Sequence, residues 1–119
     1  MVRDASIPVL LELLSFLDSP SEPVYARAMF GGHLIYCGEA AFVLVADGMT
    51  YLKTDDLNRV DFQKAGGEPF VYGKNGKDVV MSFWTPPTGS LDSASKIRPW
   101  AESAVAAAKR ASRKKKKRR

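Results

Sequence analysis

The stretch from Val24 to Lys53, VYARAMFGGHLIYCGEAAFVLVADGMTYLK, decides the fold. It consists of short runs rich in β-branched and aromatic residues, which the pairs Gly31-Gly32, Gly38-Glu39 and Asp47-Gly48 separate. Such pairs allow the positive φ angles that tight hairpins need. The stretch therefore predicts an antiparallel meander of four strands, over Val24–Phe30, His33–Cys37, Ala40–Ala46 and Met49–Lys53.

A second hairpin is expected after the meander. Asn75-Gly76, the strongest short-range hairpin signal in the chain, separates the apolar runs Pro69–Gly73 and Asp78–Trp84. Both runs have the composition of strands. Phe70 is expected to be in the core.

Three helices are expected around these strands. Apolar residues recur at helical spacing from Ser6 to Leu17, and Thr54 or Asp55 can cap a short helix that ends at Lys64. Asp92–Ile97 is expected to form a separate helical turn, and Pro99 suits the first turn of the last helix. The last helix has one continuous apolar face, made of Ile97, Trp100, Ala101, Ala104, Val105 and Ala108. The predicted fold class is α+β, with helices packed on an antiparallel sheet.

Composition places the chain among ordinary globular proteins of one domain. It has 119 residues, of which 45% are hydrophobic and 26% charged. No apolar run reaches membrane-spanning length, so no membrane contact is expected. Cys37 is the single cysteine, which excludes an internal disulfide and suits a reducing, cytoplasmic environment.

Charge is distributed very unevenly along the chain. Residues 1–108 hold nine basic and thirteen acidic residues, a formal charge of −4, whereas residues 109–119 hold nine basic residues and no acidic one. We therefore expect a folded domain over 1–108 and a basic tail over 109–119 that is disordered from Ser112 on. The tail predicts non-specific nucleic-acid contact through Lys109, Arg110, Arg113, Lys114, Lys115, Lys116, Lys117, Arg118 and Arg119, with a merely solubilising role as the alternative.

No catalytic or metal-binding constellation is evident. His33 and Cys37 lie four residues apart on one expected strand, about 13 Å from each other, which is too far for a shared metal ion or a hydrogen bond. Adjacent Asp55 and Asp56 are explained by helix capping. We expect a non-enzymatic protein without a metal or cofactor. A small-molecule binder would need a pocket near Gly31-Gly32.

Aromatic residues on the expected strands leave two alternatives for the second face of the sheet. Either both faces are partly core, or one face is an interface for a homodimer or another partner. Stacking of nucleic-acid bases on this face is disfavoured by the net negative charge of residues 1–108. The aromatic residues concerned are Tyr36, Tyr51, Tyr72, Phe83 and Trp84.

The order of motifs resembles the N-terminal domain of the TfoX/Sxy family from about Phe16 to Ala108. The residues that carry the resemblance are Met29-Phe30-Gly31-Gly32, Tyr36, Phe42, Val45, Asp47, Tyr51-Leu52-Lys53, Arg59, Phe62, Gly66, Pro69-Phe70, Tyr72, Met81-Ser82 and Pro99-Trp100. The chain departs from the family pattern at His33-Leu34 and Phe83-Trp84, and it has a basic tail where full-length members carry a second, helical domain.

The resemblance implies an α+β domain and a role in natural competence, where full-length members act as transcriptional co-activators with the cyclic-AMP receptor protein. A protein of the transcription machinery is thus an expected partner. Among the family-motif residues Met29, Phe30, Gly31, Gly32, Lys53 and Arg59, we expect Lys53 and Arg59 first as partner contacts. Ion pairs with Asp55 or Asp56 are the alternative for these two residues.

Overall fold

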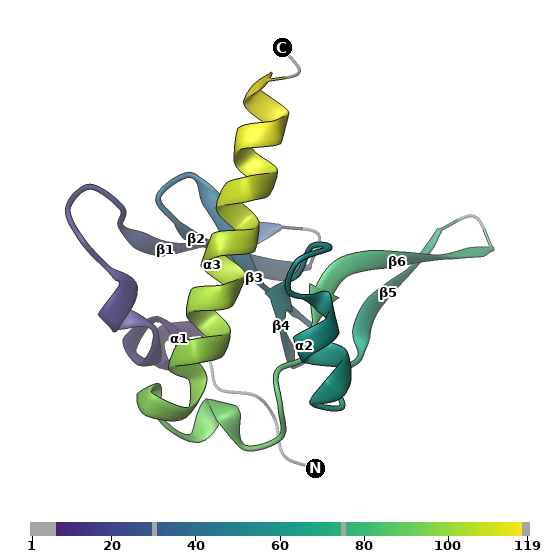
Figure 1. Ribbon diagram of the computed structural model, residues 1–119, viewed down its shortest axis with the longest axis horizontal. Coiled ribbons are helices and arrows are strands. Elements are labelled where there is room, and N and C mark those ends of the chain that lie inside the picture. The colour runs from purple at the N-terminus through teal and green to yellow at the C-terminus, as the bar shows by residue number, and fades with distance from the viewer. Residues whose placement is uncertain (1–6, 30, 75, 118–119) are drawn as a thin grey trace.

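The meander predicted for residues 24–53 forms four neighbouring strands of one sheet in the computed structural model, which describes residues 7–29, 31–74 and 76–117 (Figure 1). The strands are β1 Val24–Met29, β2 Gly32–Cys37, β3 Ala40–Ala46 and β4 Met49–Lys53, each antiparallel to the next. Asp47 and Gly48 have φ angles of 53° and 77°, so the β3–β4 turn has the two positive φ angles expected of a tight hairpin.

The second hairpin is also present and joins the meander at one point. It consists of β5 Pro69–Lys74 and β6 Lys77–Trp84, and the strand order β1-β2-β3-β4-β6-β5 makes β5 an edge strand. Only Leu52 and Lys53 of β4 pair with β6, opposite Trp84 and Phe83. The remainder of the hairpin projects from the body as a two-stranded arm (Figure 1).

A register shift explains why β3 is apolar at successive positions. Ile35 pairs with Val43, but Tyr36 pairs with Ala41, so Phe42 is an extra residue in β3. Such a bulge lets two successive side chains point the same way. Phe42 and Val43 are both fully buried in the hydrophobic core.

All helices contribute to one core on one face of the sheet. They are α1 Ile7–Leu13, α2 Arg59–Lys64 and α3 Ala94–Lys117, with 3-10 turns at Ser15–Leu17 and Ser90–Asp92. Leu10, Leu14 and Phe62 are buried against Ile35, Val43 and Leu52 of the sheet. The predicted apolar face of α3 is confirmed, and Trp100 packs edge-to-face on Phe62 with ring centroids 5.0 Å apart. The fold class is α+β, as predicted.

Several helix starts and ends differ from the sequence prediction, beginning with those of the first two helices. The first helix ends at Leu13, and a 3-10 turn replaces its last residues, whereas the predicted cap Ser6 lies outside the described residues. Helix α2 begins at Arg59, because Asp55 organises a preceding turn instead of capping the helix.

The start of α3 was predicted wrongly. The helix begins at Ala94, since the Ser93 hydroxyl accepts the Lys96 backbone N–H at 3.3 Å in the manner of an N-cap. Pro99 therefore lies inside the helix and not in its first turn, and residues 92–97 are not a separate turn.

The end of α3 was also predicted wrongly. The helix continues through Lys117, so residues 112–117 are helical and not disordered, while Arg118 and Arg119 lie outside the described residues. Like charges disfavour a new helix, but propagation from the packed part of α3 needs no nucleation, and Lys and Arg are good helix formers. Cations also complement the dipole at a helix C-terminus. No helix in the described part of the chain is long and apolar enough to cross a membrane.

Candidate functional site

The residues expected to contact a partner lie at two separate places. Met29, Gly31 and Gly32 belong to the β1–β2 turn at one end of the sheet, whereas Lys53 and Arg59 flank the loop between β4 and α2. Phe30 lies outside the described residues. The structure therefore does not bring the motif residues together into one site.

The double glycine has a structural explanation in the turn itself. A Cβ atom on Gly32 would lie 2.3 Å from the Val45 carbonyl oxygen, and Gly31 has a φ of 79°. The turn needs both glycines for close approach and for a positive φ. Met29, with 38% of its surface exposed, remains available for contact.

Lys53 and Arg59 both have partners within the chain. Arg59 Nη1 lies 3.1 Å from Asp56 Oδ1, which is one of the ion pairs weighed as the alternative. Lys53 Nζ lies 5.1 Å from the centroid of the Phe83 ring, on the side of the sheet away from the helices. Burial lowers the pKa of Lys53, and the nearby Asp55 opposes this shift.

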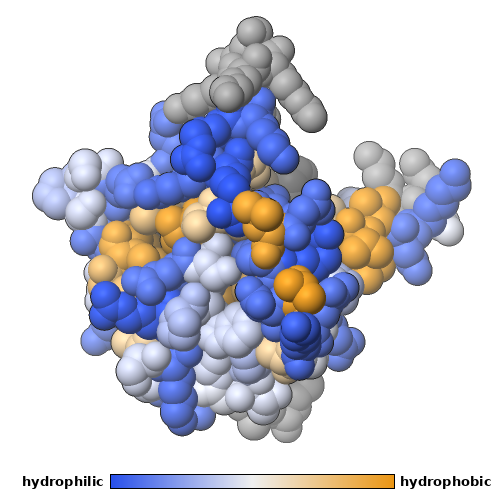
Figure 2. Space-filling view, viewed as in Figure 1, coloured by the Kyte–Doolittle hydropathy of each residue, from blue (hydrophilic) through white to orange (hydrophobic). Residues whose placement is uncertain are grey.

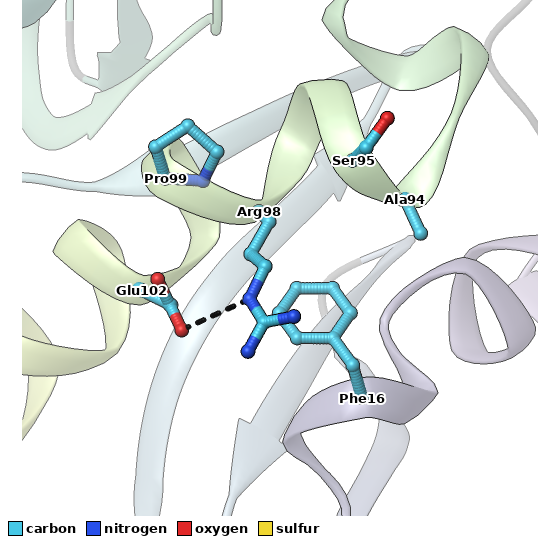
Figure 3. A pocket seen from close by; sticks show the side chains of 6 residues that line it. All are labelled: Phe16, Ala94, Ser95, Arg98, Pro99 and Glu102. Carbon is cyan, nitrogen blue, oxygen red and sulfur yellow. Dashed lines mark hydrogen bonds and ion pairs between the residues drawn. The ribbon is translucent and has the colours of Figure 1, made fainter.

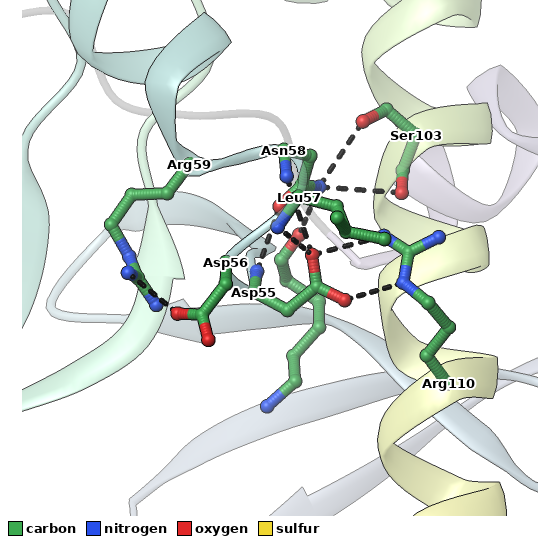
Figure 4. A network of polar contacts seen from close by, with 8 residues as sticks. Asp55, Asp56, Leu57, Asn58, Arg59, Ser103 and Arg110 are labelled. Carbon is green, nitrogen blue, oxygen red and sulfur yellow. Dashed lines mark hydrogen bonds and ion pairs between the residues drawn. The ribbon is translucent and has the colours of Figure 1, made fainter.

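A polar network centred on Asp55 joins the β4–α2 loop to α3 (Figure 4). Asp55 Oδ1 accepts the backbone N–H groups of Leu57 and Asn58 at 3.0 and 3.3 Å. Both carboxylate oxygens also accept from Arg110, at 2.5 and 2.9 Å. The Asn58 amide donates to the Lys53 carbonyl at 3.2 Å and to the Ser103 hydroxyl at 3.1 Å.

The network has a clear electrostatic consequence. The bidentate hydrogen bonds from Arg110, more than any other cause, lower the pKa of Asp55 to about 2, while Asp55 raises the pKa of Arg110. A second ion pair, 2.7 Å long, links Lys109 to Glu22. Two of the nine predicted nucleic-acid cations are therefore held by carboxylates of the body.

The other predicted cations lie farther along the chain. Arg113 and Lys114 are exposed on α3 beyond Ala108, the last core residue of the helix. At 1.5 Å per residue, α3 extends about 13 Å past Ala108, and its end projects from the body (Figure 1). The sequence predicted neither the contact of Asn58 with Ser103 nor that of Glu22 with Lys109, because the members of these pairs lie 45 and 87 residues apart in the chain.

Two depressions on the described surface are shallow and are lined by residues that make structural contacts. One of about 340 Å³ lies between Phe16 and the start of α3 (Figure 3). Arg98 crosses it, with its guanidinium 5.3 Å from the centroid of the Phe16 ring and Nε 3.3 Å from Glu102. Another of about 280 Å³ lies between α2 and Trp100. Neither adjoins Gly31-Gly32, where a small-molecule site was considered.

Cys37 is placed as a core residue. It lies on β2 with His33, is only 3% exposed, and its Sγ is 4.0 Å from the carbonyl oxygens of Leu17 and Glu22. Burial, followed by the charge of Glu22, raises the pKa of the thiol, which keeps it protonated and unreactive. The described residues contain no group of three or more His, Cys, Asp or Glu that could hold a metal ion.

The arm carries the largest accumulation of exposed apolar side chains in the described structure. Their exposed fractions are 46% for Val71, 49% for Tyr72, 43% for Val79, 63% for Val80 and 37% for Met81. Figure 2 shows hydrophobic surface on this arm, apart from the body. Because successive strand residues face opposite ways, both faces of the arm are apolar.

Aromatic side chains continue from the arm across the sheet. Tyr25 and Tyr36 are stacked, with ring centroids 5.2 Å apart, and Tyr51 packs against Phe70 at 5.2 Å. Phe70 therefore lies beside Tyr51. The prediction that it is in the core is wrong.

Comparison with known proteins identifies the family. No curated protein matches the chain. The model of the TfoX N-terminal domain matches residues 16–108, the same range over which the sequence motifs resemble that family. This domain defines a family of competence and regulatory factors and is not a known catalytic domain. The match covers most of the folded part, and the chain therefore belongs to the TfoX N-terminal domain family.

Proposed function

We propose that this protein is a non-enzymatic regulator of transcription that acts through contact with another protein. The observation that carries this proposal is the arm formed by β5 and β6, which exposes apolar side chains on both faces. A partner of the transcription machinery is the occupant in keeping with a family of competence and regulatory factors.

The arm is only weakly supported by the rest of the sheet. A two-stranded hairpin is marginal in water, and this one pairs with β4 through only two residues. It has a free edge at β5, and β6 is free of β4 along Lys77–Met81. Exposed apolar surface next to free strand edges is typical of sites that bind another protein.

The basic end of α3 adds a second, sequence-independent element. Lys109 and Arg110 are paired with carboxylates, so we assign non-specific nucleic-acid affinity to the seven cations that follow: Arg113, Lys114, Lys115, Lys116, Lys117, Arg118 and Arg119. Their contacts hold the regulator near nucleic acid without reading its sequence.

The protein contact is tested by transcript levels in the native host. A strain that lacks the chain is complemented with the wild type, with Val80→Asp on the arm, or with Val9→Asp on α1 as a control of similar exposure, 53% against 63%. We expect Val80→Asp to fail and Val9→Asp to restore the transcript profile. Full activity of Val80→Asp would refute the assigned contact surface.

The basic end is tested by duplex DNA binding across a salt series. A variant of the full chain with glutamine at these seven positions, here called the seven-glutamine variant, keeps both ion pairs to the body. For the wild type, the slope of log affinity against log salt should be negative, with a magnitude of up to about 6. For the variant, the slope should be near zero. Loss of host function in this variant alone, with Val80→Asp active, would instead favour a nucleic-acid-associated protein that acts through its basic end.

A further inference from the structure

The face of the sheet that points away from the helices, called the open face here, is rich in aromatic residues. Strand register assigns Tyr25, Tyr36, Tyr51 and Phe83 to it, because they alternate with the buried core residues Ile35 and Leu52 or pair with residues that do. Tyr72 lies on the same face as Phe70 by alternation along β5. Phe70 joins them through its contact with Tyr51. The aromatic residues thus extend from β1 at one edge to β5 at the other.

The charge on the open face is opposite in sign to that of residues 1–108 as a whole. The six strands contain one acidic residue, Asp78. Asp78 is two residues from Val80 on β6, so both side chains lie on the helix side of the sheet. The charged residues of the open face for which the structure describes side chains are Arg27, Lys53 and Lys77, all basic. Glu39, Asp47 and Glu68 lie just outside the strands, in turns or next to strand ends.

Aromatic rings together with basic side chains on one face favour a ligand that is anionic and carries flat apolar groups. Two copies packed by their open faces would bring cations against cations, which disfavours self-association through this surface. Single-stranded nucleic acid offers both phosphates for the cations and unpaired bases for the aromatic rings, whereas the bases of a duplex are already stacked.

The Tyr25–Tyr36 pair has the geometry of a stacking column. The two rings are within 6° of parallel, and the Tyr25 hydroxyl donates to the Gly38 carbonyl at 2.9 Å, which fixes the ring before any ligand arrives. Because β1 is an edge strand, a base can extend the column on the outer side of Tyr25. Tyr72, half exposed on the arm, offers a second ring at the opposite edge.

We propose that the open face binds single-stranded nucleic acid by base stacking on Tyr25 and Tyr72 and by phosphate contacts to Arg27, Lys53 and Lys77. This site is separate from the basic end of α3. It also leaves the helix side of the arm, where Val71 and Val80 lie, for the protein contact proposed above. The two proposals use opposite faces of the arm, and neither requires the other.

The experiment measures the affinity of the seven-glutamine variant for a fluorescent twelve-nucleotide oligothymidine by anisotropy at low salt. In that background, Tyr72→Ala and Tyr25→Ala should each weaken binding about 5- to 100-fold. The matched control is Val71→Ala, which removes a neighbouring side chain of nearly equal exposure on the other face of the same arm. It should change the affinity less than about twofold.

Two further variants separate stacking from a loss of folding. Tyr72→Phe keeps the ring and should retain the affinity, provided that stacking and not the hydroxyl carries it. Arg27→Gln should lower the salt slope by about 0.7, the contribution of one phosphate contact on a single strand. Thermal melts of every variant check that the fold persists.

Three results would overturn the proposal. The first is no binding of the oligonucleotide by the seven-glutamine variant. The second is an equal loss of affinity in Val71→Ala and Tyr72→Ala, which would indicate a general weakening of the arm. The third is displacement of the oligonucleotide by polyglutamate of the same length with the same dependence on Tyr72, which would assign the face to an acidic protein segment.

Discussion

The ion pair between Asp55 and Arg110 should make the stability of the fold depend on pH in the acid range. The pKa of Asp55 falls from 3.8 to about 2, chiefly because Arg110 donates two hydrogen bonds to its carboxylate. An acidic group whose pKa is lowered by folding stabilises the folded state at pH values above the pKa that it has in the unfolded chain. That contribution is lost as pH falls through 3.8 towards 2.

The magnitude follows from the size of the change in pKa. At about 1.4 kcal/mol per pKa unit, the limit is about 2.4 kcal/mol at neutral pH. The side chains of Arg110 and Asp55 are 28% and 23% exposed, so solvent screens the pair, and we expect a contribution of about 1–1.5 kcal/mol.

Asp55→Asn tests this value, because the amide oxygen can still accept the Leu57 and Asn58 N–H groups while the charge is lost. Urea unfolding at pH 7 should give a free energy of unfolding lower by about 1–1.5 kcal/mol, or a Tm lower by about 4–6 °C. The difference from the wild type should shrink below pH 4 and vanish near pH 2.

The control is Asp56→Asn, which removes a carboxylate that is 90% exposed and pairs with Arg59. It should lower the stability by less than about 0.5 kcal/mol at any pH. A deficit in Asp55→Asn that stays constant from pH 7 to pH 2 would refute the reasoning, since it would then arise from packing and not from charge.

Four further substitutions test particular contacts by urea unfolding, and a labelling experiment tests the cysteine. Thr54→Val should raise the free energy of unfolding by about 1 kcal/mol, because Thr54 Oγ1 is buried without a partner among the described residues, whereas Thr85→Val should lower it, since Thr85 Oγ1 accepts the Glu68 N–H at 3.0 Å. Gly32→Ala should cost about 1–3 kcal/mol, because its Cβ would meet the Val45 carbonyl oxygen, and Gly73→Ala, with open space, less than about 1 kcal/mol. Cys37 should react with a disulfide reagent at least about 100-fold more slowly in the folded than in the urea-unfolded protein; comparable rates would contradict the raised pKa and the burial of the thiol.

Features that depend on a few neighbouring residues could be predicted from the sequence. Asp47-Gly48 specifies a tight turn by its own backbone preferences, and the apolar periodicity of residues 97–108 identifies the buried face of α3. The ends of α3 were missed because local rules compete there. The Ser93 cap outweighed the preference of Pro99 for a first turn, and propagation of a packed helix outweighed repulsion among the terminal cations.

Features that depend on distant residues could not be predicted in this way. Asp55 and Arg110 are 55 residues apart, and only the packing of α3 on the sheet brings them together. The placement of β6 beside β4, which makes the arm project, likewise follows from tertiary packing and not from the Asn75-Gly76 turn signal.

For the nucleic-acid site proposed on the open face, the local charge matters more than the net charge of the domain. The formal charge of −4 over residues 1–108 disfavoured base stacking on the sheet, yet strands β1 to β6 hold a single acidic residue. The acids gather instead in turns, loops and helices, where Asp55 and Glu22 neutralise the first two cations of the basic end. At physiological ionic strength, screening acts over about 8 Å, so a ligand on the open face responds mainly to Arg27, Lys53 and Lys77 and less to the acids behind the sheet. The local sign of the charge, which requires the register to be known, therefore governs this surface.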